Sequence, residues 1–232
     1  MLRRLGKPEP FGTWNLERGT WNLEPGTWNL EPGTWNLEQL IIRLATLDDA
    51  APMLEIYAPL VSETAITFEF EPPTLQQFKA RMAEIQSRYP WIVSELDGRI
   101  AGFAYAGPHR ARPAYQWSVE VSVYVHADLR RLGVARTLYL KLFELLQVQG
   151  YQSAYAGITL PNDASEALHR SVGFEPVGVY KAAGFKLGKW HDAVWYQRQI
   201  NDRLPDDPTP PLRPHDASVV AAWSRLLRYQ RP

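Results

Sequence analysis

Short apolar runs separated by turn residues extend from Ile41 to Ile200, and they predict an α/β domain. Runs rich in valine, isoleucine and aromatic residues are typical of strands. The clearest local signal is Asp97-Gly98, which lies between two such runs and predicts a tight hairpin. The predicted strands cover residues 41–47, 91–96, 99–107, 116–125, 151–158, 175–181 and 191–200.

Between these strands, apolar residues recur at helical spacing. Asp48, Asp49 and Pro52 mark the start of a first helix, which continues to about Val61. Thr74 is placed to cap a second helix. The apolar positions of that helix are Leu75, Phe78, Met82 and Ile85. Two further helices are predicted, one ending near residue 149 and one over residues 163–174.

Residues 1–40 form a low-complexity leader, in which 12–38 repeat the unit Gly-Thr-Trp-Asn-Leu-Glu-Pro with a period of seven. Glycine or Pro-Gly interrupts every unit, so no coiled coil is expected. The unit is also what the DNA heptamer GGAACCT encodes when it is read three times in succession. We therefore expect a leader that is disordered or a translated simple repeat, with a true start near Leu40.

The other end of the chain changes in composition after residue 200. Residues 201–232 hold a proline-rich linker, "LPDDPTPPLRP", and a segment with the pattern of a short amphipathic helix, "DASVVAAWSRLLRYQ". We expect one domain over residues 41–200, with both ends dispensable for catalysis.

Composition excludes several classes of function. Lysine plus arginine equals aspartate plus glutamate at 25 each, so no overall charge favours nucleic acid or an anionic membrane. No apolar run approaches the roughly 20 residues of a membrane span. The chain has no cysteine, which suits a reducing cytoplasm and excludes a cysteinyl intermediate or cysteine-ligated zinc. No metal is expected.

The strand "WSVEVSVYV" has an acidic residue among its valines. Because side chains alternate along a strand, Trp117, Val119 and Val121 share one face, while Glu120 points to the other. A glutamate at such a position either faces solvent or works in a cleft, and the strand alone leaves both possibilities open.

The turn after this strand, "RRLGVART", opens directly into a helix. Backbone amides at a helix N-terminus have no partner within the helix, and the helix dipole favours an anion there. Gly133 lets the chain approach a ligand closely, and Ala135 is nearly as small. The turn therefore indicates a phosphate site.

The pattern R-x-x-G-x-A after a long strand resembles the acyl-CoA pyrophosphate motif of the GNAT superfamily. Residues 41–200 resemble the phosphinothricin N-acetyltransferases in particular, in "RYPWIV", "AGFAYAGP", "RLGVARTLY", "GITLPNDAS", "LHRSVGF" and "AAGFKLGKWHD". The resemblance implies the GNAT fold, in which a mixed, mostly antiparallel sheet is flanked by helices and splayed around the acyl-CoA site. It also implies a homodimer.

By this resemblance, acetyl-CoA is the co-substrate. Its pantetheine arm should pair with the backbone of Val123, Tyr124 and Val125. Asn162 should contact it at a strand end, although a helix cap is the alternative for this residue. The pyrophosphate should bind the turn formed by Arg131, Leu132, Gly133, Val134, Ala135 and Arg136.

Two residues are candidates for proton transfer. Glu120 is the predicted base that removes a proton from the acceptor amine. His169 corresponds to the residue that protonates the leaving thiolate in the family, or it only packs on its helix. The predicted acceptor site consists of Phe68, Arg110, Arg112, Tyr115 and Trp190. The arginines could clamp a carboxylate or phosphinate, or they could be solvated loop charges.

The sequence thus predicts a cytoplasmic N-acetyltransferase that transfers acetyl from acetyl-CoA to the amino group of a small amino-acid analogue by direct attack. Phosphinothricin and methionine sulfoximine or sulfone are the acceptors that the family suggests. Two alternatives stay open at this point. One is a GNAT enzyme for another amine, such as a polyamine or a peptide N-terminus, and the other is a non-catalytic acyl-CoA sensor.

Overall fold

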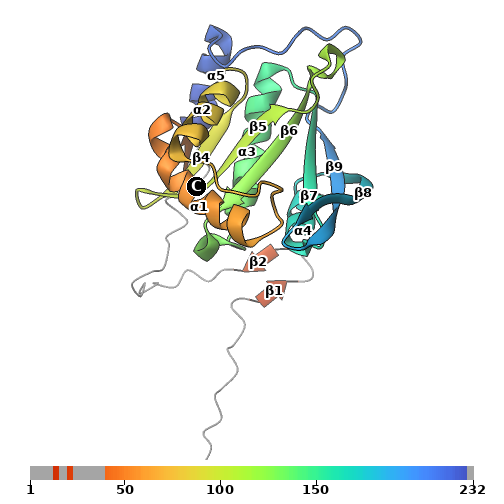
Figure 1. Ribbon diagram of the computed structural model, residues 1–232. Helices are drawn as coiled ribbons and strands as arrows, with labels where there is room; N and C mark the ends of the chain where they lie inside the picture. The colour runs from red at the N-terminus through yellow and green to blue at the C-terminus, as the bar shows by residue number, and fades with distance from the viewer. Residues whose placement is uncertain (1–12, 16–19, 23–39, 229–232) are drawn as a thin grey trace, which may run out of the picture. The chain divides into compact units, whose positions relative to one another are not determined.

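The computed structural model describes residues 13–15, 20–22 and 40–228 (Figure 1). Strands β1 (Thr13–Asn15) and β2 (Thr20–Asn22) pair antiparallel, with Trp14 opposite Trp21 in the next copy of the repeat. The expectation that the leader is disordered or a translated repeat stays a prediction. Most of this leader lies outside the described ranges.

A seven-stranded sheet forms the centre of the main unit, in the order β3-β4-β5-β6-β7-β9-β8. All neighbouring strands are antiparallel except β6 and β7, which confirms the predicted mixed sheet. The strands are β3 (Ile41–Leu44), β4 (Trp91–Leu96), β5 (Arg99–Pro108), β6 (Ser118–Val125), β7 (Ser153–Thr159), β8 (Glu175–Lys186) and β9 (Lys189–Gln199). The last pair is longer than predicted, because β8 continues through a bulge between Tyr180 and Gly184.

Helices cover both faces of the sheet (Figure 1). They are α1 (Ala50–Glu63), α2 (Leu75–Gln86), α3 (Val134–Gln149) and α4 (Asp163–Ser171). Thr74 caps α2 as predicted, since its hydroxyl accepts a hydrogen bond from the amide of Gln77. Among the residues described, no helix combines the length and apolar character needed to cross a membrane.

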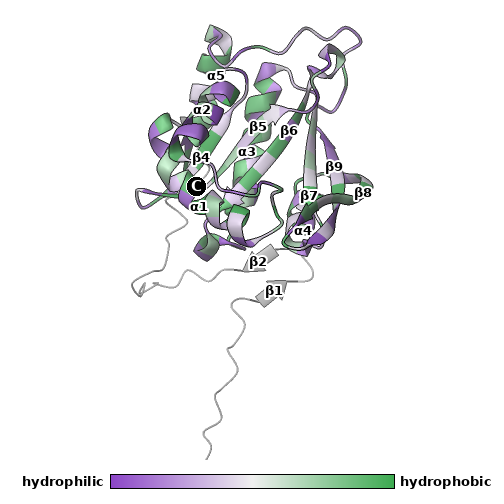
Figure 2. Ribbon diagram, viewed as in Figure 1, coloured by the Kyte–Doolittle hydropathy of each residue, from purple (hydrophilic) through white to green (hydrophobic). Residues whose placement is uncertain are grey.

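The two faces have separate apolar cores. On one, α1 and α2 bury aromatic residues of β4 and β5, including Trp91 and Phe103. Register pairing puts Tyr105 of β5 opposite Ser122 of β6, and Phe103 opposite Tyr124. Glu120 therefore shares the face that α1 and α2 cover, because residues 120, 122 and 124 of a strand point the same way. Figure 2 shows the apolar residues concentrated where helices and sheet meet.

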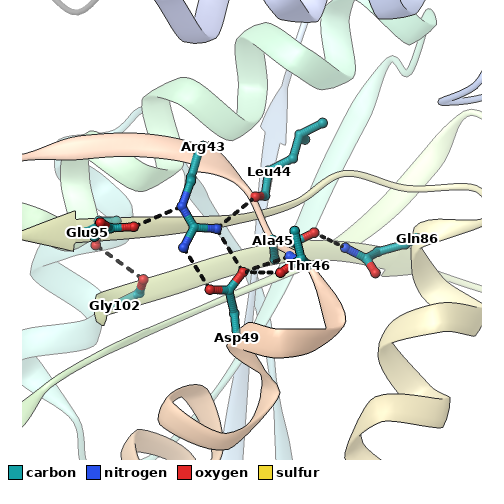
Figure 3. Close-up of polar contacts among 9 residues, drawn as sticks. Arg43, Leu44, Ala45, Thr46, Asp49, Gln86, Glu95 and Gly102 are labelled. Atoms are coloured by element: carbon teal, nitrogen blue, oxygen red, sulfur yellow. Dashed lines mark hydrogen bonds and ion pairs between the residues drawn. The ribbon is translucent and has the colours of Figure 1, made fainter. Parts of the chain in front are cut away.

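A partly buried ion-pair network fixes the first strand (Figure 3). The Arg43 guanidinium donates to both carboxylate oxygens of Asp49, at 2.7 and 2.8 Å, and to Glu95 at 2.9 Å. Asp49 also accepts a hydrogen bond from the backbone amide of Thr46, and this bond turns the chain out of the sheet. The strand therefore ends at Leu44, whereas the sequence predicted that it would continue to residue 47. Burial acts to raise the pKa of Asp49, but these hydrogen bonds outweigh it and hold the pKa below its usual value.

The end of the chain packs against the domain. Helix α5 (Ala217–Arg228) buries Val219 and Trp223, and the Trp223 indole donates to the carbonyl of Leu145 in α3 at 3.0 Å. Before this helix, the backbones of Leu212 and Gln149 are joined by a 2.8 Å hydrogen bond. These contacts tie residues 212–228 to α3, and the expectation that this end of the chain is dispensable for catalysis stays a prediction.

Two adjacent valines of α5 test whether this packing stabilises the domain. Val219 is fully buried, whereas Val220 is 48% exposed. Val219→Ala should lower the free energy of unfolding by about 2 kcal/mol, and Val220→Ala should change it by less than about 0.5 kcal/mol. Chemical denaturation of both variants measures the difference. Equal effects of the two substitutions would show that α5 does not contribute to the core.

Candidate active site

The central feature of the site is a separation of two neighbouring strands. β6 and β7 pair only through Ser118, Val119 and Glu120, which lie opposite residues 153–155. Beyond Glu120, β7 continues beside β9, and no described strand pairs with the β7-facing edge of β6 (Figure 1). An unpaired strand edge presents backbone donors and acceptors in a row. Residues 121–125 are thus able to bind an extended ligand by backbone pairing.

A cavity of about 570 Å³ lies at this separation. Residues 121–125 of β6 and 156–159 of β7 line it, which brings together the three predicted pantetheine contacts Val123, Tyr124 and Val125. Asn162 lines it too, and its side chain also accepts from the amide of Ser165 at 3.2 Å. The position of Asn162 is therefore compatible with both hypotheses for this residue, a contact with the co-substrate and a helix cap.

The predicted phosphate turn borders the same cavity. Arg131 and Gly133 adopt left-handed backbone conformations, with φ of 67° and 84°, and α3 begins at Val134. Alternation of left- and right-handed residues makes a concave row of amides that suits an anion. Of the six predicted residues, Leu132 is outside the cavity lining, and its side chain is 45% exposed. Its predicted role is therefore limited to its backbone amide.

Gly133 tests this turn. A Cβ at Gly133 would meet no atom within 4 Å, so the protein has space for a side chain there. Glycine is favoured at this position because of its positive φ. Gly133→Val should raise KM for acetyl-CoA about tenfold or more, because left-handed strain of about 1–2 kcal/mol would reorient the amides. Gly150, at the other end of α3, has φ of 90° and equally open space. Gly150→Val supplies the control, and an equal change in KM for both variants would contradict the assignment.

Glu120 lies where the strands begin to separate. It is opposite Gly107 of β5 and Tyr155 of β7, and it is half-buried. Burial raises the pKa of the Glu120 carboxyl above its usual value of 4.5, and the charge of Arg110 offsets part of this rise. A carboxylate with a raised pKa is a better proton acceptor, which is the property required of a general base.

Tyr155, which lies opposite Glu120, belongs to an aromatic group that the sequence did not reveal. The His109 ring stacks on Tyr155 with a centroid distance of 4.0 Å, and it meets Trp195 edge-on at 5.9 Å. Arg110 lies over the Trp195 ring at 5.8 Å. Tyr155 and Trp195 sit in strands with ordinary alternation, so only the register of β7 against β6 and β9 identifies them.

The predicted acceptor residues are not all brought to this place. Arg110 lies near Glu120, and Tyr115 meets His109 edge-on at 6.0 Å. Arg112 is exposed, and no contact in the described part of the chain joins it to Glu120. Phe68 packs against the backbone of Gly184 at the tip region of β8. Trp190 is 64% exposed and packs edge-on against Phe185, so within one chain it does not cover Glu120.

His169 is buried in α4 and hydrogen-bonded at both ring nitrogens. Nδ1 is 2.7 Å from the carbonyl oxygen of Ser165, and Nε2 is 3.1 Å from the hydroxyl of Tyr139. A carbonyl only accepts, so Nδ1 is assigned the proton and Nε2 accepts from Tyr139 in the neutral ring. Burial lowers the pKa of His169, partly offset by the bond to Ser165, so the neutral form is favoured.

The comparisons with known proteins agree with this geometry. A family model described as an acetyltransferase (GNAT) domain matches residues 42–195. The chain belongs to the GNAT acetyltransferases. It is similar to a phosphinothricin N-acetyltransferase of Streptomyces viridochromogenes, with 42% identity over 74% of this chain and 93% of that one. An L-methionine sulfoximine/L-methionine sulfone acetyltransferase of Salmonella typhimurium is 32% identical over 72% and 99% of the two chains.

Solved structures confirm the fold of this acetyltransferase. A phosphinothricin acetyltransferase from Sinorhizobium meliloti in complex with acetyl-CoA superposes with a TM-score of 0.70 and 33% identity. The match covers 73% of this acetyltransferase and 93% of that chain. The enzyme is therefore an acetyl-CoA-dependent acetyltransferase, and the free edge of β6, the left-handed turn and the cavity between them fit the co-substrate. Within the described ranges, no three histidine or acidic side chains are grouped to hold a metal.

Proposed function

We propose that this acetyltransferase acetylates the α-amino group of a small, anionic amino-acid analogue of the phosphinothricin or methionine sulfoximine and sulfone type. The observation that supports this most directly is that Arg110 lies over Trp195 and its positive charge acts on the carboxyl of Glu120, at the point where β6 and β7 separate. A guanidinium there can bind a carboxylate or phosphinate, while the carboxylate of Glu120 faces the amine. The names of the relatives agree with this class of acceptor.

The chemistry requires a free amine, because an ammonium has no lone pair. Acetyl-CoA supplies an acyl thioester, which a free amine attacks directly with release of the thiol. Glu120, directly or through a water molecule, takes the proton from the ammonium and so generates the nucleophile. Its raised pKa increases its basicity, so it accepts the ammonium proton more readily than an ordinary carboxylate does.

The two candidate proton-transfer groups act from opposite sides of the sheet. Glu120 shares the face covered by α1 and α2, whereas His169 and Tyr139 belong to α4 and α3 on the other face (Figure 1). Both His169 and Tyr139 line the cavity. Because both ring nitrogens of His169 have partners, we assign the Tyr139 hydroxyl of this hydrogen-bonded pair as the group that gives its proton to the leaving thiolate, and Tyr139 then regains a proton from solvent.

The turn and the strand edge hold the co-substrate in this proposal. Amides of residues 131–136 bind the pyrophosphate at the start of α3, and Arg131 and Arg136 add positive charge beside it. The backbone of residues 123–125 pairs with the pantetheine arm. Asn162 contacts the arm where β7 ends. Phe68 and Tyr115 belong to the acceptor side, whereas the position of Trp190 within one chain does not support the acceptor role predicted for it.

The alternatives are less well supported. A polyamine acceptor would favour an acidic lining, but Arg110 is the charged neighbour of Glu120. A sensor without catalysis has no need of a half-buried glutamate with a raised pKa at the strand separation.

A homodimer and a cytoplasmic location complete the proposal. β8 forms the edge of the sheet, and it exposes Val177, Val179 and Tyr180 by 60%, 43% and 53%. Phe185 and Trp190 extend this apolar surface to the end of the hairpin. An exposed apolar edge strand is expected to be covered, and the family resemblance favours a second copy of the chain. The cysteine-free sequence favours the cytoplasm.

Replacing Glu120 by glutamine separates basicity from shape. Glu120→Gln should lower kcat by about 100-fold or more at neutral pH, because the amide cannot accept the ammonium proton. Wild-type kcat/KM should rise with pH through a pKa above 4.5, and the variant should lack that step. The defect should shrink at high pH, where free amine forms without help. Wild-type turnover by the variant at neutral pH would remove Glu120 from the mechanism.

The acceptor charge tests the proposed function as a whole. The free acid of an amino-acid analogue should be acetylated well, and its amide poorly, when release of free CoA is followed. Arg110→Gln with Arg112→Gln should weaken use of the acid and leave KM for acetyl-CoA unchanged. Single variants divide the effect, and most of it should come from Arg110, because Arg110 packs over Trp195 and its charge acts on Glu120, whereas no contact in the described part of the chain joins Arg112 to Glu120. Equal turnover of acid and amide by the wild type would show that the acceptor is not recognised by its negative charge.

A further inference from the structure

A buried lysine joins the β8–β9 hairpin to the loop that bears Phe68. Lys186 is only 4% exposed, although it lies directly before the hairpin turn at Leu187 and Gly188. Its ammonium donates to the carbonyl oxygens of Val61 and Thr67, both at 2.7 Å. Burying an ammonium is costly unless its donors are satisfied, so these two bonds fix the two carbonyls relative to the hairpin.

The two carbonyls belong to the end of α1 and to the loop that follows it. Val61 is in the last turn of α1, where carbonyls have no acceptor role within the helix and cations are favoured. Thr67 lies in the loop of residues 64–70 that follows the helix. Lys186 therefore caps α1 and holds the loop with one side chain. Its own carbonyl accepts from His191 of β9 at 3.0 Å, which fixes the lysine backbone.

The loop of residues 64–70 reaches the cavity and the acceptor side. Ile66 lines the cavity, and Phe68 is 37% exposed. The Phe68 ring packs on Gly184, where a Cβ would come within 2.7 Å of a ring carbon. The Tyr57 hydroxyl lies 3.2 Å from the Thr67 hydroxyl, and Arg81 pairs with Glu69 at 2.8 Å. Together with the bond from Lys186 to the Thr67 carbonyl, these contacts hold the residues on both sides of Phe68.

We propose that Lys186 is a positioning residue for the acceptor site, which sets the loop of residues 64–70 and thereby the Phe68 ring against the hairpin. The inference rests on the proposed function in one respect, namely that Phe68 contacts the acceptor. It predicts that the lysine acts on acceptor binding and not on acetyl-CoA binding, because the phosphate turn and the free edge of β6 line the cavity, whereas Phe68 and Lys186 do not.

Methionine keeps most of the length of lysine and removes its donors. Lys186→Met should raise KM for the acceptor by between about tenfold and 100-fold, with kcat and KM for acetyl-CoA within about twofold of the wild type. Amide hydrogen exchange over residues 64–70 should become faster. Lys189→Met, an exposed lysine of the same hairpin, is the matched control and should change neither measurement.

A second pair of variants keeps the lysine in place. Gly184→Ala should displace the Phe68 ring and raise the acceptor KM, whereas Gly178→Ala on the same strand meets no atom within 4 Å and should not. If Lys186→Met is folded and leaves both the acceptor KM and the loop exchange unchanged, the inference is wrong. If the wild type acetylates no anionic amino acid, the proposed function fails, while faster loop exchange in Lys186→Met still supports the positioning contact.

Discussion

Pairing between β6 and β7 stops at Glu120, and the rest of the site depends on this interruption. A parallel pair normally continues its hydrogen bonds along both strands. Here β7 follows β9 instead, which leaves the backbone of residues 121–125 with one free edge. The cavity between residues 121–125 and 156–159, and the position of Glu120 at the point where the two strands part, follow from that separation.

The separation of β6 and β7 also explains why the acceptor and the co-substrate can be assigned to opposite faces of the sheet. Glu120 and its aromatic neighbours Tyr155 and Trp195 lie on the face of α1 and α2, where an acceptor can approach. The start of α3 and the His169–Tyr139 pair lie on the other face, where the co-substrate binds in our proposal. An amine and a thioester can therefore meet through the gap without a covalent enzyme intermediate, in agreement with a chain that contains no cysteine.

The sequence predicted the local features that short-range chemistry determines. The Thr74 cap, the Asp97-Gly98 turn and the helix start after Gly133 need only neighbouring residues, and the structure has all three. Features set by distant residues were not predictable in the same way. The first strand ends early because Asp49 binds Arg43 and Thr46, and Tyr155 and Trp195 reach the site through strand register. The amphipathic pattern of residues 217–228 predicted a helix, but it did not predict that the apolar side of this helix packs against α3.

Amide hydrogen exchange over β6, with and without acetyl-CoA, tests the central claim most directly. With acetyl-CoA at about 100 times its Kd and no acceptor present, the β7-facing amides of residues 121–125 should exchange up to about 100-fold more slowly. The amides of residues 118–120 should change little, because β7 already pairs with that part of the strand. If calorimetry shows acetyl-CoA bound and exchange over residues 121–125 is unchanged, the free edge of β6 is not where the co-substrate pairs.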